Sequence, residues 1–348
     1  MRILILKPSA LGDVVQALPV ARVLRRQFPQ AELHWWVDAA LSPLLEGDPD
    51  LDRLILFERT RWSVPWRWHE AVRSLRQLRT QRYDWVIDLQ ALARSGATAW
   101  LADGALTVGL DDPREGAPTF YDLRVPRPTF LTHAVDWYLE VPRALGVPVH
   151  WDFEWLPRRP AAAADVQRRW PADGHRWIAL QPGARWLNKR WPAEHFAALV
   201  RRFAEELPDA RFAVVGSGRD QALGQTLERA VSGRCLDLTG KTTLPELVEW
   251  LRRCELLIGN DSGPLHIAAA LGKPVVALFG PTEPRRTGPY RQLDRVLQLP
   301  LPCVPCLSKR CRCARPLACL RDLAPQVVVD QALRALRGEG VRSPASRR

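Results

Sequence analysis

The residues best suited to chemistry lie in three short segments that each follow a predicted strand. The first is Lys7-Pro-Ser-Ala-Leu-Gly-Asp13, between an apolar run at 2–6 and a helical pattern. In one interpretation Asp13 caps the helix by accepting its first N–H groups. In the other it is a general base at the carboxyl end of a strand. The segment holds no Gly-x-Gly-x-x-Gly, which disfavours a nicotinamide-binding site.

The second segment carries positive charge just before another predicted helix. It is the loop 181–195, in which Lys189 precedes a helix start near Pro192. The backbone N–H groups of Gly183 and Ala184, together with Lys189, would form an anion site able to hold a diphosphate. A loop with a solvated basic pair is the alternative interpretation.

The third segment turns directly from a strand into an Ala-rich helix. The sequence Asn260-Asp-Ser-Gly263 ends the strand. It would present the N–H groups of Ser262 and Gly263 at a helix N-terminus, which is a cradle for phosphate. His266 lies on the first turn, and Asp261 would position a sugar or orient this histidine. Taken alone, His266 is equally consistent with a structural role.

These segments require two sets of parallel strands to position them. Short apolar runs alternate with amphipathic ones, which is typical of βα units and predicts an α/β fold. The pattern stops at 147–173, which predicts a linker, and then restarts. Strands are predicted at 2–6, 32–37, 54–57, 84–89, 106–109, 177–181, 211–216, 235–238, 256–259, 275–279 and 295–299, and helices at 14–28, 69–81, 193–207, 220–231, 244–254, 265–271 and 325–337.

Length and charge narrow the class of protein. The 348 residues are 47% hydrophobic and 25% charged, which describes a globular chain of about two domains. The net charge of +12 favours anionic partners such as nucleotide phosphates, phosphorylated lipids, an anionic membrane face or nucleic acid. No apolar run approaches the roughly 20 residues of a membrane span, and the first apolar run is too short for a signal peptide. We therefore expect a cytoplasmic protein.

Together with Phe279-Gly-Pro-Thr282, the three segments resemble family 9 glycosyltransferases, the lipopolysaccharide heptosyltransferases. The resemblance covers nearly the whole chain. It implies a GT-B fold, with two Rossmann-like doubly wound domains facing a central cleft. The N-terminal domain, 1–155, would bind the acceptor, and the C-terminal domain, 174–324, would bind the nucleotide sugar, followed by a helix and a frayed tail at 325–348.

The resemblance also implies a role for individual residues. Asp13 matches the catalytic base, and Arg59, Arg61 and Arg114 match acceptor-binding positions. The region 59–82 is rich in Arg and Trp, which suits a phosphorylated glycolipid, although a solvated helix face with inward Trp is the alternative. The residues implied to bind the donor are Gly183, Ala184, Lys189, Asp220, Thr242, Asp261, Ser262, Gly263 and His266.

The implied activity is an inverting transfer of heptose from ADP-heptose to a lipopolysaccharide inner-core acceptor at the cytoplasmic face of the inner membrane. Lys189 and a helix N-terminus would stabilise the departing diphosphate, so no cofactor is required. A transferase for another sugar, a nucleotide-sugar epimerase and a non-catalytic sugar-nucleotide sensor are the alternatives. A basic nucleic-acid-binding protein is disfavoured, because the basic residues are spread along the chain and no nucleic-acid module is present.

A cluster of cysteines near the C-terminus has no role in the proposed transfer reaction. Two of the seven, Cys235 and Cys254, are isolated, and five lie between 303 and 319. The Cys-x-x-Cys pair with later cysteines has zinc-like spacing, while reduced thiols are the alternative. The predicted structural zinc site comprises Cys303, Cys306, Cys311 and Cys319, with Cys313 nearby.

Overall fold

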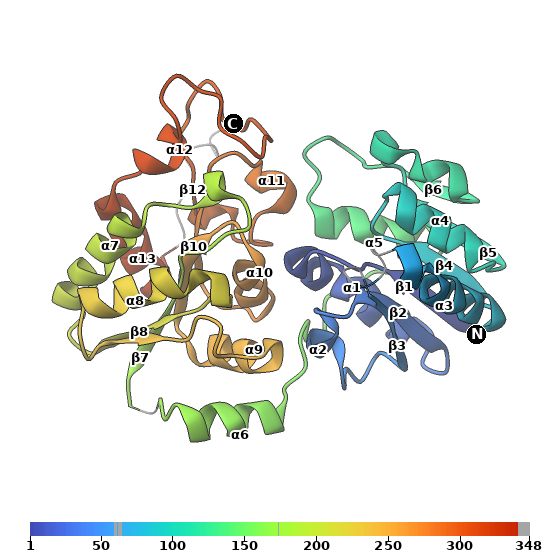
Figure 1. The fold of residues 1–348 in the computed structure, drawn as a ribbon, viewed down its shortest axis with the longest axis horizontal. Coiled ribbons are helices and arrows are strands. Elements are labelled where there is room, and N and C mark those ends of the chain that lie inside the picture. The colour runs from blue at the N-terminus through green and yellow to red at the C-terminus, as the bar shows by residue number, and fades with distance from the viewer. Residues whose placement is uncertain (59–60, 62–64, 173, 340–348) are drawn as a thin grey trace. The chain divides into compact units, whose positions relative to one another are not determined.

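The computed structural model describes residues 1–58, 61, 65–172 and 174–339 (Figure 1). The chain divides into two units, Met1–Pro157 and Arg158–Arg348, called the N-terminal and C-terminal units below. Among the described residues, each unit contains a six-stranded sheet in which all paired strands are parallel. Helices flank each sheet, so the predicted α/β class is confirmed.

The sheet of the N-terminal unit has the strand order β3-β2-β1-β4-β5-β6. The order reverses between β1 and β4, and the carboxyl ends of two such strands flank the place where doubly wound folds bind ligands. The edge strand β6 was not predicted from the sequence. The strands are β1 Arg2–Leu6, β2 Glu32–Asp38, β3 Arg53–Phe57, β4 Trp85–Asp88, β5 Leu106–Leu110 and β6 Leu123–Val125.

Two groups of helices accompany this sheet. Leu4 and Leu6 of β1 pack in one cluster with Leu78 of α3 and Ala99 of α4. Ile3 and Ile5, which alternate with them, are also fully buried and point to the opposite face. Helix α1 packs against α5. The helices are α1 Leu11–Gln27, α2 Ser42–Leu45, α3 Trp68–Thr80, α4 Ala93–Leu101 and α5 Ala134–Ala144, of which α2, α4 and α5 were not predicted.

The sheet of the C-terminal unit has the order β12-β11-β10-β7-β8-β9. Its order reverses between β7 and β10, so this pair marks the second ligand-binding edge. The strands are β7 Arg176–Gln181, β8 Ala210–Val214, β9 Cys235–Asp237, β10 Leu256–Asn260, β11 Val275–Leu278 and β12 Val296–Leu297.

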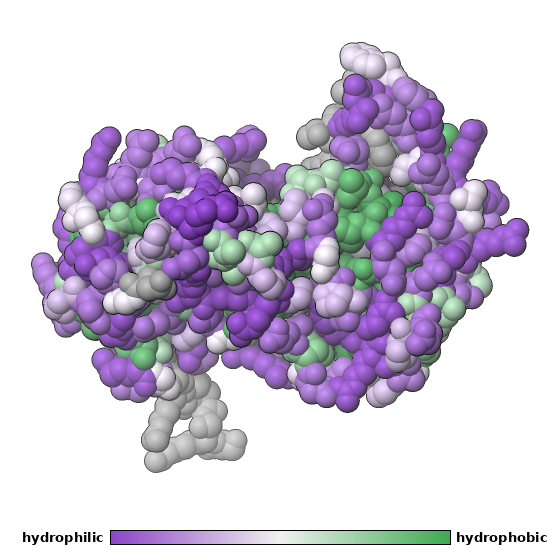
Figure 2. Space-filling model, turned by 90° about the horizontal axis from the view of Figure 1, so that it is seen from below, coloured by the Kyte–Doolittle hydropathy of each residue, from purple (hydrophilic) through white to green (hydrophobic). Residues whose placement is uncertain are grey.

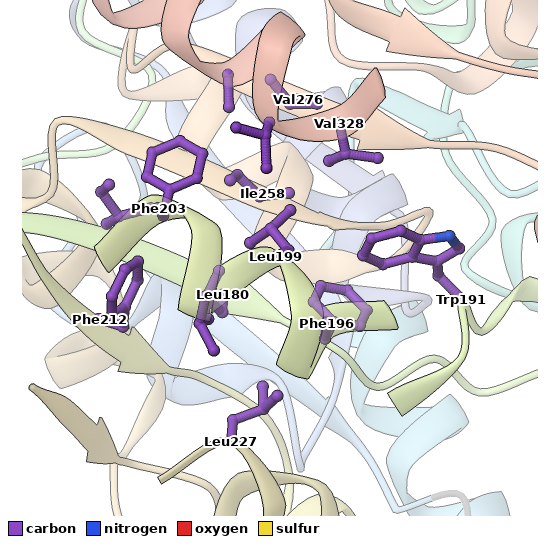
Figure 3. Close-up of a cluster of buried hydrophobic side chains, with 14 of the residues drawn as sticks. Leu180, Trp191, Phe196, Leu199, Phe203, Phe212, Leu227, Ile258, Val276 and Val328 are labelled. Atoms are coloured by element: carbon purple, nitrogen blue, oxygen red, sulfur yellow. The ribbon is translucent and has the colours of Figure 1, made fainter. Parts of the chain in front are cut away.

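A large apolar cluster fills one face of this second sheet (Figure 3). Phe196, Leu199 and Phe203 project from one side of α7 at helical spacing, and Phe203 packs edge-on against Phe212 of β8 at 6.3 Å. Val328 of α13 closes the cluster. The helices are α6 Pro160–Arg169, α7 Ala193–Glu206, α8 Gln221–Ala230, α9 Leu244–Arg253, α10 Gly263–Ala270, α11 Pro284–Thr287, α12 Ala318–Arg321 and α13 Pro325–Leu336.

The predicted linker is wrong in one respect, because the stretch 147–173 contains α6, which packs against α9. Pro160 occupies the first helical position and four alanines follow, a combination that favours a helix without an amphipathic pattern. The predicted helix at 14–28 also begins earlier, at Leu11.

In the described part of the chain, no helix is long and apolar enough to cross a bilayer. The face drawn in Figure 2 is mostly hydrophilic, with hydrophobic residues gathered in separate areas.

Candidate active site

Asp13 lies just after the carboxyl end of β1, at the strand reversal of the N-terminal unit. It is the third residue of α1, and its Oδ2 accepts the N–H of Ala10 at 3.0 Å. This hydrogen bond at the start of α1 is of the kind that the capping interpretation predicts. The side chain is half-buried at this edge.

Two of the three predicted acceptor-binding arginines are described, and both follow carboxyl ends of the same parallel sheet. Arg61 follows β3 and pairs with Glu70 of α3 at 2.7 Å. Arg114 follows β5 and pairs with Asp112 at 2.8 Å. Since the carboxyl ends of parallel strands share one edge, the fold places these two loops and the Asp13 loop along it. Arg59 lies outside the described residues.

The centre of the second site is an ion pair between Lys189 and Asp261. The Nζ–Oδ2 distance is 2.6 Å, and the side chains are 17% and 7% exposed. Lys189 follows β7 and Asp261 follows β10, which are adjacent strands. The structure thus brings together two residues that the sequence places 72 positions apart.

His266 joins this pair from the first turn of α10. Its Nε2 lies 3.8 Å from Oδ1 of Asp261. Burial alone would raise the pKa of Asp261, but hydrogen bonding from His266 and the charge of Lys189 outweigh it and hold this pKa well below its usual range. Asp261 is therefore ionised at neutral pH, between the ammonium of Lys189 and the imidazole of His266.

Two positioning residues were not singled out from the sequence. The hydroxyl of Thr282, after β11, donates to Oδ2 of Asp261 at 2.6 Å. Asn260 is fully buried, accepts the Trp191 N–H at 3.0 Å and donates to the Pro182 carbonyl at 2.8 Å. Asn260 thereby fastens the Lys189 loop to β10. The only sequence signal for either residue was its place in a motif.

The N-terminus of α10 faces the same site. Ser262 is its N-cap residue, yet its side chain makes no capping hydrogen bond. Among the described residues, the buried Oγ of Ser262 has no hydrogen-bond partner. Together with Gly263, the first helical residue, this geometry suits an anion at the helix N-terminus.

Gly183 and Asp220 form the next part of the site, at the ends of β7 and β8. Asp220 is buried, and its Oδ2 accepts the Ser217 N–H at 3.0 Å and the Ser217 hydroxyl at 2.8 Å. Oδ1 lies 3.5 Å from a guanidinium nitrogen of Arg190, whose Nε donates to the buried Ala184 carbonyl. A Cβ at position 183 would lie 2.5 Å from this carboxylate, which explains why a glycine is needed there.

Replacing Gly183 by Ala is expected to lower the free energy of unfolding by about 1–3 kcal/mol. The new Cβ would lie 2.5 Å from the Asp220 carboxyl carbon, so the carboxylate must leave Ser217. Chemical denaturation measures the change. Gly218→Ala is the matched control, because a Cβ there meets nothing within 4 Å. Equal stability of Gly183→Ala and the wild type would contradict the crowding argument.

The remaining predicted residues lie farther along the C-terminal unit. Thr242 is half-buried in the turn between β9 and α9, beside the α9 cap Thr243. Cys303 and Cys306 are exposed, and Cys311, Cys313 and Cys319 are half-buried. Within the ranges that the structure describes, no group of three or more His, Cys, Asp or Glu side chains is arranged to hold a metal ion. The structural zinc site at these cysteines stays a prediction.

Comparisons with known proteins show which family the chain resembles. A family model described as Glycosyltransferase family 9 (heptosyltransferase) matches residues 71–315. The lipooligosaccharide heptosyltransferase 2 of Haemophilus influenzae is 30% identical, over 86% of this chain and 89% of that protein. The lipopolysaccharide heptosyltransferase 1 of Pseudomonas aeruginosa is 29% identical, over 89% and 87%.

The fold matches solved structures of the same kind. The E. coli ADP-heptose LPS heptosyltransferase II superposes with a TM-score of 0.77 at 25% identity, over 97% of this chain and 99% of that one. The predicted GT-B class, with two Rossmann-like units in one chain, is confirmed. The family match spans well over half of the sequence, and the chain belongs to glycosyltransferase family 9, whose members transfer sugars.

Proposed function

We propose that this enzyme transfers a heptose from ADP-heptose to the inner core of lipopolysaccharide, with inversion at the anomeric carbon. The single observation that supports this most is the buried Lys189–Asp261–His266 group beside the α10 N-terminus. The Lys189 ammonium and the N–H groups at the helix N-terminus suit a nucleoside diphosphate. The E. coli heptosyltransferase II is named for ADP-heptose.

In this proposal Asp13 is the general base. The acceptor hydroxyl oxygen attacks the anomeric carbon from the face opposite the diphosphate, and its proton passes to the Asp13 carboxylate. The new C–O bond forms as the bond to the diphosphate breaks, and ADP leaves with the electron pair. Lys189 and the α10 N-terminus stabilise the charge that develops on ADP, so no cofactor is required.

The acceptor in this proposal is a phosphorylated glycolipid, bound at the arginine-bearing loops of the N-terminal unit. Arginine suits phosphate because its planar fork donates two parallel hydrogen bonds. The enzyme would meet this lipid as a peripheral protein at the cytoplasmic face of the inner membrane. Arg61 and Arg114, both at the carboxyl edge of the sheet, are the residues proposed to bind it.

Calorimetric titration with ADP, UDP, GDP and a stable ADP-heptose analogue tests the donor. Selective binding of ADP and of the analogue is the expected result. A preference for UDP would move the enzyme to another sugar within the same fold. Binding of none of these nucleotides would overturn the donor site built on Lys189 and Asp261.

Arg61→Ala is expected to raise the KM for the acceptor about tenfold or more, because a charge-assisted hydrogen bond to phosphate is lost. The KM for the donor stays unchanged. Steady-state kinetics with each substrate varied separately measures both values. Arg143→Ala is the matched control, since Arg143 has the same 47% exposure and a similar ion pair, with Glu140. A change in the donor KM would contradict acceptor binding by Arg61.

A further inference from the structure

The loop 298–317, which joins β12 to α12, is strongly basic and is called the basic loop (Figure 1). It carries Lys309, Arg310, Arg312 and Arg315 and contains no acidic residue. Such a composition favours an anionic ligand. None of these four residues has a part in the proposed function.

Two hydrogen bonds fasten the basic loop to segments that form the donor site. Asn188 is 5% exposed, lies in the turn that carries Lys189, and donates from its Nδ2 to the Ser308 carbonyl at 2.8 Å. The N–H of the next residue back, Leu307, donates to the carbonyl of Pro281, in the segment after β11, at 2.7 Å. The basic loop is therefore held against both the turn after β7 and the segment after β11.

Lys309 follows these two anchors and lies against the same indole ring as Lys189. Its Nζ is 5.8 Å from the centre of the Trp186 ring, and the Nζ of Lys189 is 4.8 Å from that centre. An ammonium group near an indole ring is attracted by the negative charge of its face. The ring thus holds a second positive charge near the lysine proposed to bind the diphosphate.

The two lysines differ in their carboxylate partners. Lys189 pairs with Asp261 at 2.6 Å, so much of its charge is offset within the site. Lys309 is exposed and forms no ion pair with any residue that the structure describes. The diphosphate of a nucleotide sugar carries a negative charge on each phosphate. Lys309 supplies positive charge that the Lys189–Asp261 pair does not.

We propose that Lys309 is a further donor-binding residue: its ammonium, placed at Trp186 by the anchored basic loop, binds the diphosphate of the nucleotide sugar together with Lys189. This inference rests on the proposed function, because it adds a residue to the donor site of that function. It concerns the diphosphate and not the base, so it applies to any nucleoside diphosphate that the site takes.

Calorimetric titration of Lys309→Met with ADP is the first test. The Kd is expected to rise about tenfold and to depend less on salt concentration, because a charge-assisted hydrogen bond to phosphate is lost. Arg312→Met is the matched control, since Arg312 is an exposed basic residue of the same loop. Its Kd for ADP is expected to stay within about twofold of the wild type. An unchanged Kd in Lys309→Met, or equal losses in the two variants, would overturn the proposal.

A second test removes the ring that holds Lys309. In a Trp186→Leu background, the ammonium of Lys309 has no indole beside it. Adding Lys309→Met is then expected to raise the Kd for ADP by no more than about threefold, which a double-mutant cycle measures. A tenfold rise in both backgrounds would overturn the placement of Lys309 by Trp186.

Lys189→Met separates this inference from the proposed function. If Lys189→Met weakens ADP binding while Lys309→Met does not, the donor site stands and the role of Lys309 fails. If the wild type prefers UDP and Lys309→Met weakens UDP binding, the proposed donor is wrong and the role of Lys309 stands. If the wild type binds no nucleoside diphosphate, both fail.

Discussion

Asp13→Asn is expected to lower kcat by about two to four orders of magnitude, the usual contribution of a general base. Asparagine keeps the size of the side chain and its oxygen can still accept the Ala10 N–H, which holds the start of α1. It cannot take a proton from the acceptor hydroxyl. The affinity for ADP is expected to stay within about twofold, because the proposed donor residues belong to the other unit.

Single-turnover transfer assays and calorimetry with ADP measure these two effects. Asp38→Asn is the matched control, because Asp38 ends the neighbouring strand β2 and its Oδ1 accepts the Ala40 N–H at 3.0 Å. This variant is expected to keep transfer within about threefold of the wild type. Equal losses in the two variants would mean that Asp13 only caps its loop.

Lys189→Met is expected to lower the free energy of unfolding by about 3 kcal/mol and to weaken ADP binding by about tenfold or more. The substitution removes the partner 2.6 Å from a carboxylate that is 7% exposed, so an uncompensated charge is left buried. In a double variant, the additional substitution Asp261→Asn removes that charge. The double variant is therefore expected to recover most of the stability but none of the ADP affinity.

Chemical denaturation and calorimetry on both variants provide the measurements. Arg168→Met is the matched control, since its pair with Asp165 is similarly short, at 2.7 Å, but its two side chains are 75% and 46% exposed. An exposed pair of this kind contributes about 1 kcal/mol or less. If the double variant were as unstable as Lys189→Met, the buried charge would not be the cause of the loss.

The contribution of the Lys189–Asp261 pair to folding stability is expected to decrease at acidic pH. The folded-state pKa of Asp261 lies below its usual range, so the pair stabilises the fold fully above the unfolded value of about 4. This contribution is lost as the pH falls toward the folded value. The stability difference between the wild type and the double variant is therefore expected to shrink on acidification below about pH 5.

Most of the secondary structure could be predicted because local patterns determine it. The run Ile3–Leu6 is continuously apolar, as a strand covered on both faces must be, and β1 occupies the predicted range 2–6. Helix α7 carries its apolar residues at helical spacing and begins after Pro192, where it was predicted. The helix α6 was missed because its stability comes from alanine content and from packing on α9, neither of which produces an apolar period.

The sequence by itself determined the α/β class, the two repeats of the strand pattern and the segments that carry Asp13, Lys189 and Asp261. Each of these depends on residues adjacent in the chain, where apolar spacing, turns and helix starts are encoded locally. Only the tertiary structure decided which side chains meet. The strand order of each sheet sets Thr282 beside Asp261 and Asn260 against the Lys189 loop, because crossovers join strands that are distant in sequence.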